Sequence, residues 1–143
     1  MRWWSAPTAG EIVWCHFPDT INLKPKPRPG LIIATKQDDI GQIYVTVAYG
    51  TSQKLNRLFS GEFQITKAEH PAAFISAGLS YDTKFDFRNV LELPFNDVYF
   101  SVPAMAPHGQ NPQLGILHPS MTRIAAAAFS AARKKLNNGL KPL

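Results

Sequence analysis

The sequence predicts a mainly β fold, in which a small, strongly bent antiparallel sheet or barrel is closed by one C-terminal α-helix. Short segments rich in β-branched and aromatic residues recur along the chain, separated by turns rich in glycine, proline and aspartate. Only the last part of the chain has the alanine-rich pattern of a long helix. The 143 residues are 45% hydrophobic, 11% aromatic and 17% charged, which predicts one globular domain over residues 1–143.

Three strands are predicted in the first third of the chain, at residues 11–17, 30–35 and 42–49. The third strand is the strongest, because nearly every residue in it is β-branched or aromatic. Four prolines lie between residues 18 and 30 and exclude a helix or a central strand, so a loop is predicted there. Residues 38–41 (Asp-Asp-Ile-Gly) are predicted to form the turn between the second and third strands.

Shorter elements and one long loop follow. Further strands are predicted at residues 62–66 and 84–93, and a short helical turn at 70–78, where Pro71 occupies the first helical position. Residues 94–113 contain four prolines and are predicted to form an irregular loop, which at this length is often functional. Residues 115–117 are predicted to be a short strand or turn.

The C-terminal helix is predicted from Pro119 to Asn137. Pro119 suits a first helical turn, and residues 125–128 are all alanine, which favours helix. Gly139 is a candidate cap just beyond the end of the helix. The apolar stripe of this helix is expected to consist of Met121, Ile124, Ala128, Ala132 and Leu136.

The net charge of +5 is unevenly distributed. Residues 1–36 contain five basic and two acidic side chains, residues 37–100 five and eight, and residues 101–143 five and none. This polarity is expected when one face of a protein meets a polyanion such as nucleic acid. A net charge also helps to keep a small protein in solution, so charge alone does not decide between the two explanations.

Familiar catalytic and metal-binding motifs are absent from the sequence. The four histidines lack the i, i+4 spacing of a helical metal site, and there is no G-x-S-x-G motif or phosphate-binding glycine loop. Cys15 lies in a predicted strand and is expected to be a buried, inert thiol. We therefore expect neither a metal nor a cofactor.

No apolar run approaches about 18 residues, and the N-terminal segment is too short for a signal peptide, so no membrane association and a cytoplasmic location are expected.

Two segments carry more information. Residues 24–29 (Lys-Pro-Lys-Pro-Arg-Pro) form a basic, conformationally restricted loop that leads into a buried strand and holds Arg28 at its root, where a guanidinium suits phosphate oxygens. Residues 49–52 (Tyr-Gly-Thr-Ser) end the strongest strand, where Gly50 would permit a tight bend that presents two hydroxyl groups. Turn chemistry alone also explains both segments.

The segments that suggest a family are residues 10–14 (Gly-Glu-Ile-Val-Trp), 17–18 (Phe-Pro), 28–33 (Arg-Pro-Gly-Leu-Ile-Ile), 47–52 (Val-Ala-Tyr-Gly-Thr-Ser), 87–90 (Phe-Arg-Asn-Val) and 115–119 (Gly-Ile-Leu-His-Pro). In their order and spacing they resemble the PemK/MazF-type toxins over most of residues 10–136, most specifically at the Arg-Pro signature. The resemblance implies an SH3-like barrel with a C-terminal helix, a fold that topoisomerase poisons share, and usually a homodimer. It further implies a sequence-specific, metal-independent endoribonuclease that cleaves single-stranded RNA and is inhibited by a cognate antitoxin, with Arg28 and Thr51 as the catalytic pair.

That chemistry needs a cation and a hydrogen-bond donor at the phosphate, and a base for the attacking 2′-hydroxyl. Arg28 is assigned to the phosphate oxygens and Thr51 to the donor, and His16 is the candidate base because imidazole titrates near neutrality. The expected RNA-binding residues are Lys24, Lys26, Ser52, Lys54 and Tyr49. The alternative is a non-catalytic barrel that binds nucleic acid or a protein partner, including a topoisomerase-poison-like role.

Overall fold

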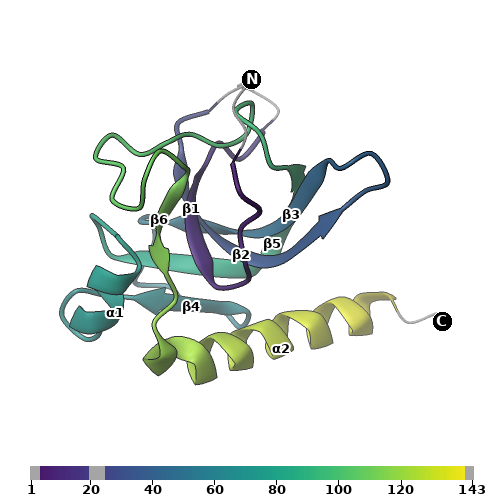
Figure 1. Ribbon diagram of the computed structural model, residues 1–143. Coiled ribbons are helices and arrows are strands. Elements are labelled where there is room, and N and C mark those ends of the chain that lie inside the picture. The colour runs from purple at the N-terminus through teal and green to yellow at the C-terminus, as the bar shows by residue number, and fades with distance from the viewer. Residues whose placement is uncertain (1–3, 20–24, 141–143) are drawn as a thin grey trace.

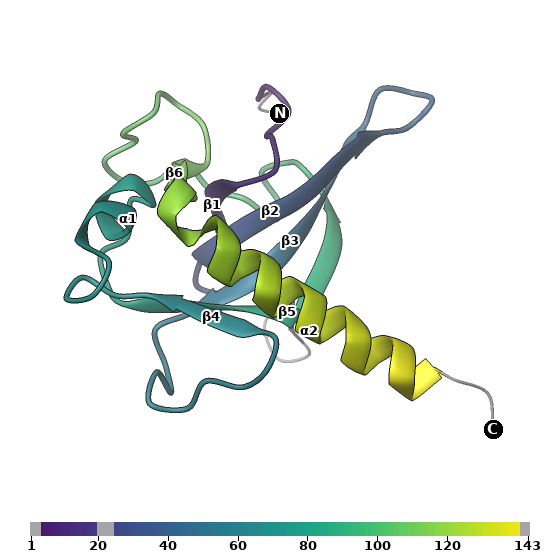
Figure 2. The same ribbon diagram turned by 90° about the horizontal axis from the view of Figure 1, so that it is seen from below.

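The structure is a computed structural model that describes residues 4–19 and 25–140, with side chains described as far as Lys134. Its elements are β1 (Glu11–Cys15), β2 (Arg28–Gln37), β3 (Ile43–Thr51), β4 (Glu62–Ile65), α1 (Pro71–Ser76), β5 (Thr83–Pro94), β6 (Gln113–Ile116), the 3₁₀ turn η1 (Pro119–Met121) and α2 (Thr122–Leu140). The strands form one curled antiparallel sheet in the order β4-β5-β3-β2-β1-β6. Helix α2 runs across the sheet against β4 and β5, and α1 lies near one end (Figures 1 and 2). The predicted fold class is confirmed, as a half-barrel whose edge strands are β4 and β6.

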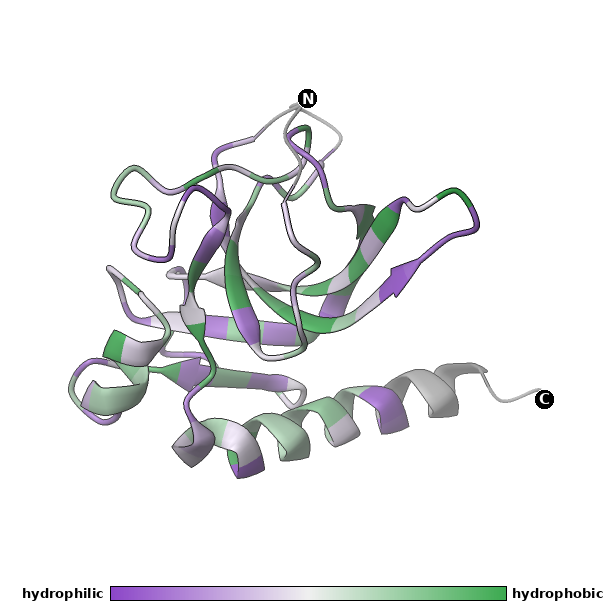
Figure 3. Ribbon diagram, in the orientation of Figure 1, coloured by the Kyte–Doolittle hydropathy of each residue, from purple (hydrophilic) through white to green (hydrophobic). Residues whose placement is uncertain are grey.

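The curl buries two hydrophobic clusters, one on each face of the sheet. Consecutive residues point to opposite faces, so Ile12 and Leu31 pack toward the helices while Val13 and Ile32 pack inside the curl. Figure 3 shows the resulting concentration of hydrophobic residues along the strands. Burial on both faces explains why these segments lack a clear alternation of polar and apolar residues.

Several strand boundaries differ from the prediction by one or two residues, and two of these differences concern Arg28 and Thr51. β2 already begins at Arg28, and β3 continues to Thr51, so both residues belong to the sheet and not to loops. Pro29 of β2 is paired with Trp14 of β1. The Trp14 N–H points away from Pro29 and donates to the Pro112 carbonyl at 2.9 Å, so this pair makes no hydrogen bond that a proline could break. The missing proline N–H therefore removes no hydrogen bond between the two strands.

The helices are found where they were predicted, with two corrections. The buried stripe of the C-terminal helix consists of Met121, Ala125, Ala128 and Ala132, spaced as one helical face, whereas Ile124 is 47% exposed. The helix also continues through Gly139 to Leu140 and does not end at Asn137. The side chain of Leu136 lies outside the described part of the chain. Over the described residues, no helix combines the length and the apolar character needed to span a membrane.

Candidate functional site

Arg28 and Thr51 lie at neighbouring strand ends. The β2–β3 pairing ends with Gly30 opposite Tyr49, and Arg28 and Thr51 each lie two residues beyond this last pair. On its other side, Arg28 pairs with Cys15 of β1, and Thr51 pairs with Lys84 of β5. The two residues that the sequence singled out in separate segments therefore lie at the neighbouring ends of β2 and β3, next to the close contact of Gly50 with the Pro29 carbonyl.

Gly50 allows these strand ends to approach each other. A Cβ atom at residue 50 would lie 2.4 Å from the Pro29 carbonyl oxygen and 2.9 Å from a Phe85 ring carbon, which is too close for any side chain. The sequence suggested a tight bend at Gly50, but the residue lies within β3. Glycine is needed at residue 50 because the backbones of β2 and β3 approach each other too closely for a side chain.

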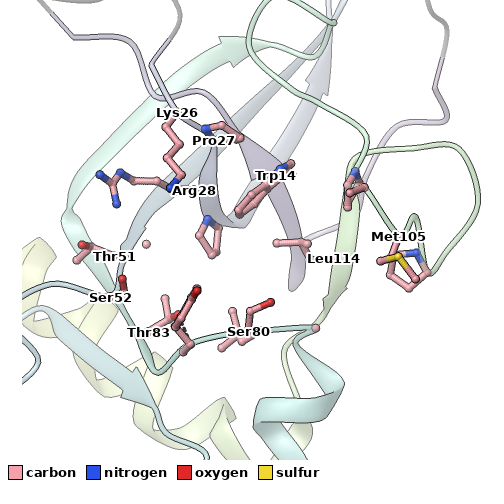
Figure 4. A pocket seen from close by; sticks show the side chains of 18 of the residues that line it. Trp14, Lys26, Pro27, Arg28, Thr51, Ser52, Ser80, Thr83, Met105 and Leu114 are labelled. Atoms are coloured by element: carbon pink, nitrogen blue, oxygen red, sulfur yellow. Dashed lines mark hydrogen bonds between the residues drawn. The ribbon is translucent and has the colours of Figure 1, made fainter.

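Arg28 and Thr51 line the same cavity, which has a volume of about 720 Å³ (Figure 4). The Thr51 side chain is largely buried, and its Oγ1 accepts a hydrogen bond from the Gln53 N–H at 3.1 Å. A hydroxyl oxygen that accepts a hydrogen bond in this way can still donate another hydrogen bond through its own proton. Arg28 is half-buried and forms no ion pair within the described residues, so its guanidinium is available to an anionic ligand.

Three other predicted RNA-binding residues surround this pair. Lys26 and Ser52 are exposed and line the same cavity. Tyr49 lines a second cavity of about 440 Å³, of which Lys26 and Arg28 also form part of the wall. The Tyr49 ring packs edge-on against Phe17, with 5.0 Å between the ring centroids. The cationic residues 26 and 28 therefore lie between two hollows of the surface.

Lys54 is not brought to the site. Lys54 is exposed in the turn after Thr51, with a left-handed φ of 54°, and lines neither cavity. Lys24 lies outside the described residues.

His16 lies beside the basic loop, as expected, but it is buried and lines neither cavity. Nδ1 hydrogen-bonds the Pro25 carbonyl, which can only accept, so this nitrogen carries the proton. Nε2 contacts the Ser101 hydroxyl, so both ring nitrogens are occupied. The geometry connects His16 to the loop before Arg28, and does not bring it to the Arg28–Thr51 cavity.

The far wall of the 720 Å³ cavity comes from segments that the sequence analysis did not select. Ser80 and Tyr81 contribute from the connection between α1 and β5, Thr83 from the start of β5, and Met105 from the long loop between β5 and β6. The length of that loop was the one sequence signal for this wall. Nothing in the local sequence indicated residues 80–83.

Behind Thr51, a buried ion pair anchors the following loop. Lys84 Nζ lies 3.1 Å from Glu62 Oε2 and donates to the Arg57 carbonyl at 2.8 Å, while Glu62 Oε1 accepts from the Phe59 N–H at 2.7 Å. Hydrogen bonding to Asp86 raises the pKa of the neighbouring Arg88. These contacts fix the segment that begins at Ser52 and so hold one side of the cavity mouth.

Cys15 takes no part in this cavity and is buried, and burial raises the pKa of its thiol. The prediction of a buried, unreactive thiol is thus supported. Among residues 4–19 and 25–140, no group of three or more His, Cys, Asp and Glu side chains is arranged as a metal site.

Comparisons with known proteins identify the fold. No protein-family model matches the chain, and no curated protein matches it. Among solved structures, it is similar to a chain from a structure described as an endoribonuclease in complex with its cognate antitoxin from a mycobacterial species. The two share 16% identity with a TM-score of 0.55, and the match covers 96% of this chain and all of the other. At this identity the likeness shows a common fold, so the half-barrel with its C-terminal helix is also the fold of that chain.

Proposed function

We propose that this protein is an endoribonuclease toxin of the PemK/MazF type that cleaves single-stranded RNA at short sequences without a metal ion. The observation that supports this most is the convergence of Arg28 and Thr51 on one cavity. The positive net charge and the fold shared with a chain from an endoribonuclease–antitoxin complex agree with it.

In the proposed reaction, the ribose 2′-oxygen attacks the adjacent phosphorus and the bond to the 5′-oxygen of the next nucleotide breaks. The 2′-proton leaves to a base, and the departing 5′-oxygen takes up a proton, so the products are a 2′,3′-cyclic phosphate and a 5′-hydroxyl. Negative charge accumulates on the phosphate oxygens during the attack. Arg28 stabilises that charge, because its guanidinium stays protonated and offers two parallel donors. A preorganised donor of this kind lowers the barrier by about 3 kcal/mol.

Thr51 donates a hydrogen bond from its hydroxyl to the same phosphate group. The Gln53 N–H holds the Thr51 oxygen in place, so little orientation is needed during the reaction. Lys26 and Ser52 contact neighbouring phosphates from the cavity wall. Through Pro25, His16 positions the chain that leads to Arg28 and is therefore a positioning residue in this proposal.

The partners in this proposal are single-stranded RNA, a cognate antitoxin and a second copy of the chain. An acidic antitoxin complements the net charge of +5, and it inhibits by covering the Arg28 cavity. A homodimer would have one such cavity in each copy.

The test is the incubation of the purified protein with a varied single-stranded RNA pool, once with magnesium and once with a chelator. We expect cleavage in both conditions, and cyclic phosphate ends on the products. Arg28→Ala should abolish cleavage, whereas Arg123→Ala should leave it unchanged, because Arg123 is exposed on α2 and lines neither cavity. An intact pool in both conditions contradicts the proposal, and RNA binding without cleavage favours the non-catalytic barrel.

A further inference from the structure

The wall of the 720 Å³ cavity that carries residues 80–83 presents an aromatic side chain to solvent. Tyr81 lines the cavity and is 73% exposed. Figure 4 shows Ser80 and Thr83, the labelled residues around it, across the cavity from Lys26 and Pro27. An aromatic ring therefore lies on the wall that faces the cationic segment.

The backbone that carries this ring is held on both sides. The Thr83 hydroxyl donates to the Tyr81 carbonyl at 2.8 Å, and the Asp82 carboxylate accepts from the Lys67 N–H at 2.8 Å. Gly78 is in the left-handed region and lies so close to β6 that a Cβ would be 2.0 Å from the Leu114 carbonyl oxygen. The phenol ring is thus exposed on a fixed support, where it contributes little to the core.

The rest of the cavity suits a nucleoside. Its volume lies within the range of about 300–1,000 Å³ that is usual for small-molecule sites, which combine apolar walls with a few polar groups. Arg28, Thr51 and Ser52 supply the polar groups at one side. Met105, which is 89% exposed, lines the cavity from the long loop and adds to its apolar side chains, among them Trp14 and Leu114.

We propose that Tyr81 is the nucleobase-stacking residue of this site, which holds a base flanking the phosphate bound by Arg28 and Thr51. This inference rests on the proposed function and names a residue that contacts the substrate. Single-stranded RNA is usually recognised through unstacked bases that lie on aromatic side chains. Tyr81 therefore fixes the RNA strand so that one phosphodiester reaches Arg28, and the phenol hydroxyl is not needed for the stacking.

The test uses Tyr81→Ala and Tyr81→Phe, with Ile75→Ala as the matched control. Ile75 is 78% exposed on the nearby helix α1 but does not line the cavity. Binding is measured by fluorescence anisotropy, with an RNA oligonucleotide made uncleavable by 2′-O-methylation. We expect Tyr81→Ala to weaken binding by about fivefold to a hundredfold, and Tyr81→Phe and Ile75→Ala to bind as the wild type does.

A second measurement separates stacking from a purely structural role. The bases on the two sides of the mapped cleavage position are removed one at a time, as abasic substitutions in the RNA. If Tyr81 stacks on one of these bases, one abasic RNA binds the wild type as weakly as intact RNA binds Tyr81→Ala, and combining the two changes causes no further loss. The inference would be overturned if Tyr81→Ala bound RNA as tightly as the wild type. It would also be overturned if, for both abasic RNAs, the loss of affinity multiplied with the loss caused by Tyr81→Ala. In either case RNA cleavage by the wild type would stand. A wild-type protein that neither binds nor cuts single-stranded RNA refutes the proposed function itself.

Discussion

Gly50→Ala is the substitution whose effect follows most directly from the geometry. The added methyl group would lie 2.4 Å from the Pro29 carbonyl oxygen and 2.9 Å from a Phe85 ring carbon, so the ends of β2 and β3 must separate. Such overpacking costs about 1–3 kcal/mol of folding stability. A domain of ordinary stability, about 5–15 kcal/mol, therefore stays folded at 25 °C.

The loss of activity should exceed the loss of stability. Arg28 and Thr51 lie directly beside the forced contact, and a displacement of about 1 Å at a reacting centre lowers the rate by about a hundredfold. Urea unfolding measures the first effect, and RNA cleavage at 25 °C, where the variant is folded, measures the second. Gly10→Ala is the control, because Gly10 is left-handed but a Cβ there meets no atom within 4 Å. It should lose stability without a comparable loss of cleavage rate. A Gly50→Ala protein that unfolds and cleaves like the wild type would refute the reasoning.

Three further predictions concern buried groups. His16→Ala should lower the rate of RNA cleavage, measured over a range of pH, without changing the shape of the pH profile. If the acidic limb of the profile disappears and the cleavage rate decreases by about 10²- to 10⁴-fold, His16 is instead the general base. Lys84→Met leaves the buried Glu62 carboxylate with the Arg88 guanidinium, 3.7 Å away, as its remaining cationic partner, and should lower the free energy of unfolding by at most about 3–5 kcal/mol. Recovery of stability in Lys84→Met/Glu62→Leu, measured by urea unfolding, checks this, and an unchanged single variant contradicts it. Because burial raises the pKa of the Cys15 thiol, the unfolded state loses its proton first as pH rises, so stability should fall above about pH 9. Cys15→Ala should show a smaller decrease over that range, and identical curves would contradict this account.

The sequence predicted the order and type of the elements well, because the strand and helix patterns are local. It failed at the ends of β2 and β3, where tertiary contacts decide. Pro29 removes no hydrogen bond to β1, because the Trp14 N–H donates to Pro112, and Gly50 is required by the Pro29 carbonyl on the neighbouring strand. Neither fact can be derived from the periodicity of either segment.

The candidate site was predicted on one wall only. Arg28 and Thr51 were selected through a motif resemblance, and the β2–β3 register brings them together. Tyr81 and Met105 were missed, because the approach of their loops depends on contacts such as that of Gly78 with Leu114. The burial of His16 likewise depends on Ser101 of the long loop, whose path the sequence does not reveal.

The most direct test of the central claim is a double-mutant cycle on RNA cleavage with Arg28→Ala, Thr51→Ala and the double variant, all shown to be folded. If the guanidinium and the hydroxyl act on one phosphate group, each single variant should lose about 10²- to 10³-fold in rate, and the double variant should lose less than the product of the two. A single variant that cleaves at the wild-type rate, or losses that simply multiply, would contradict the account.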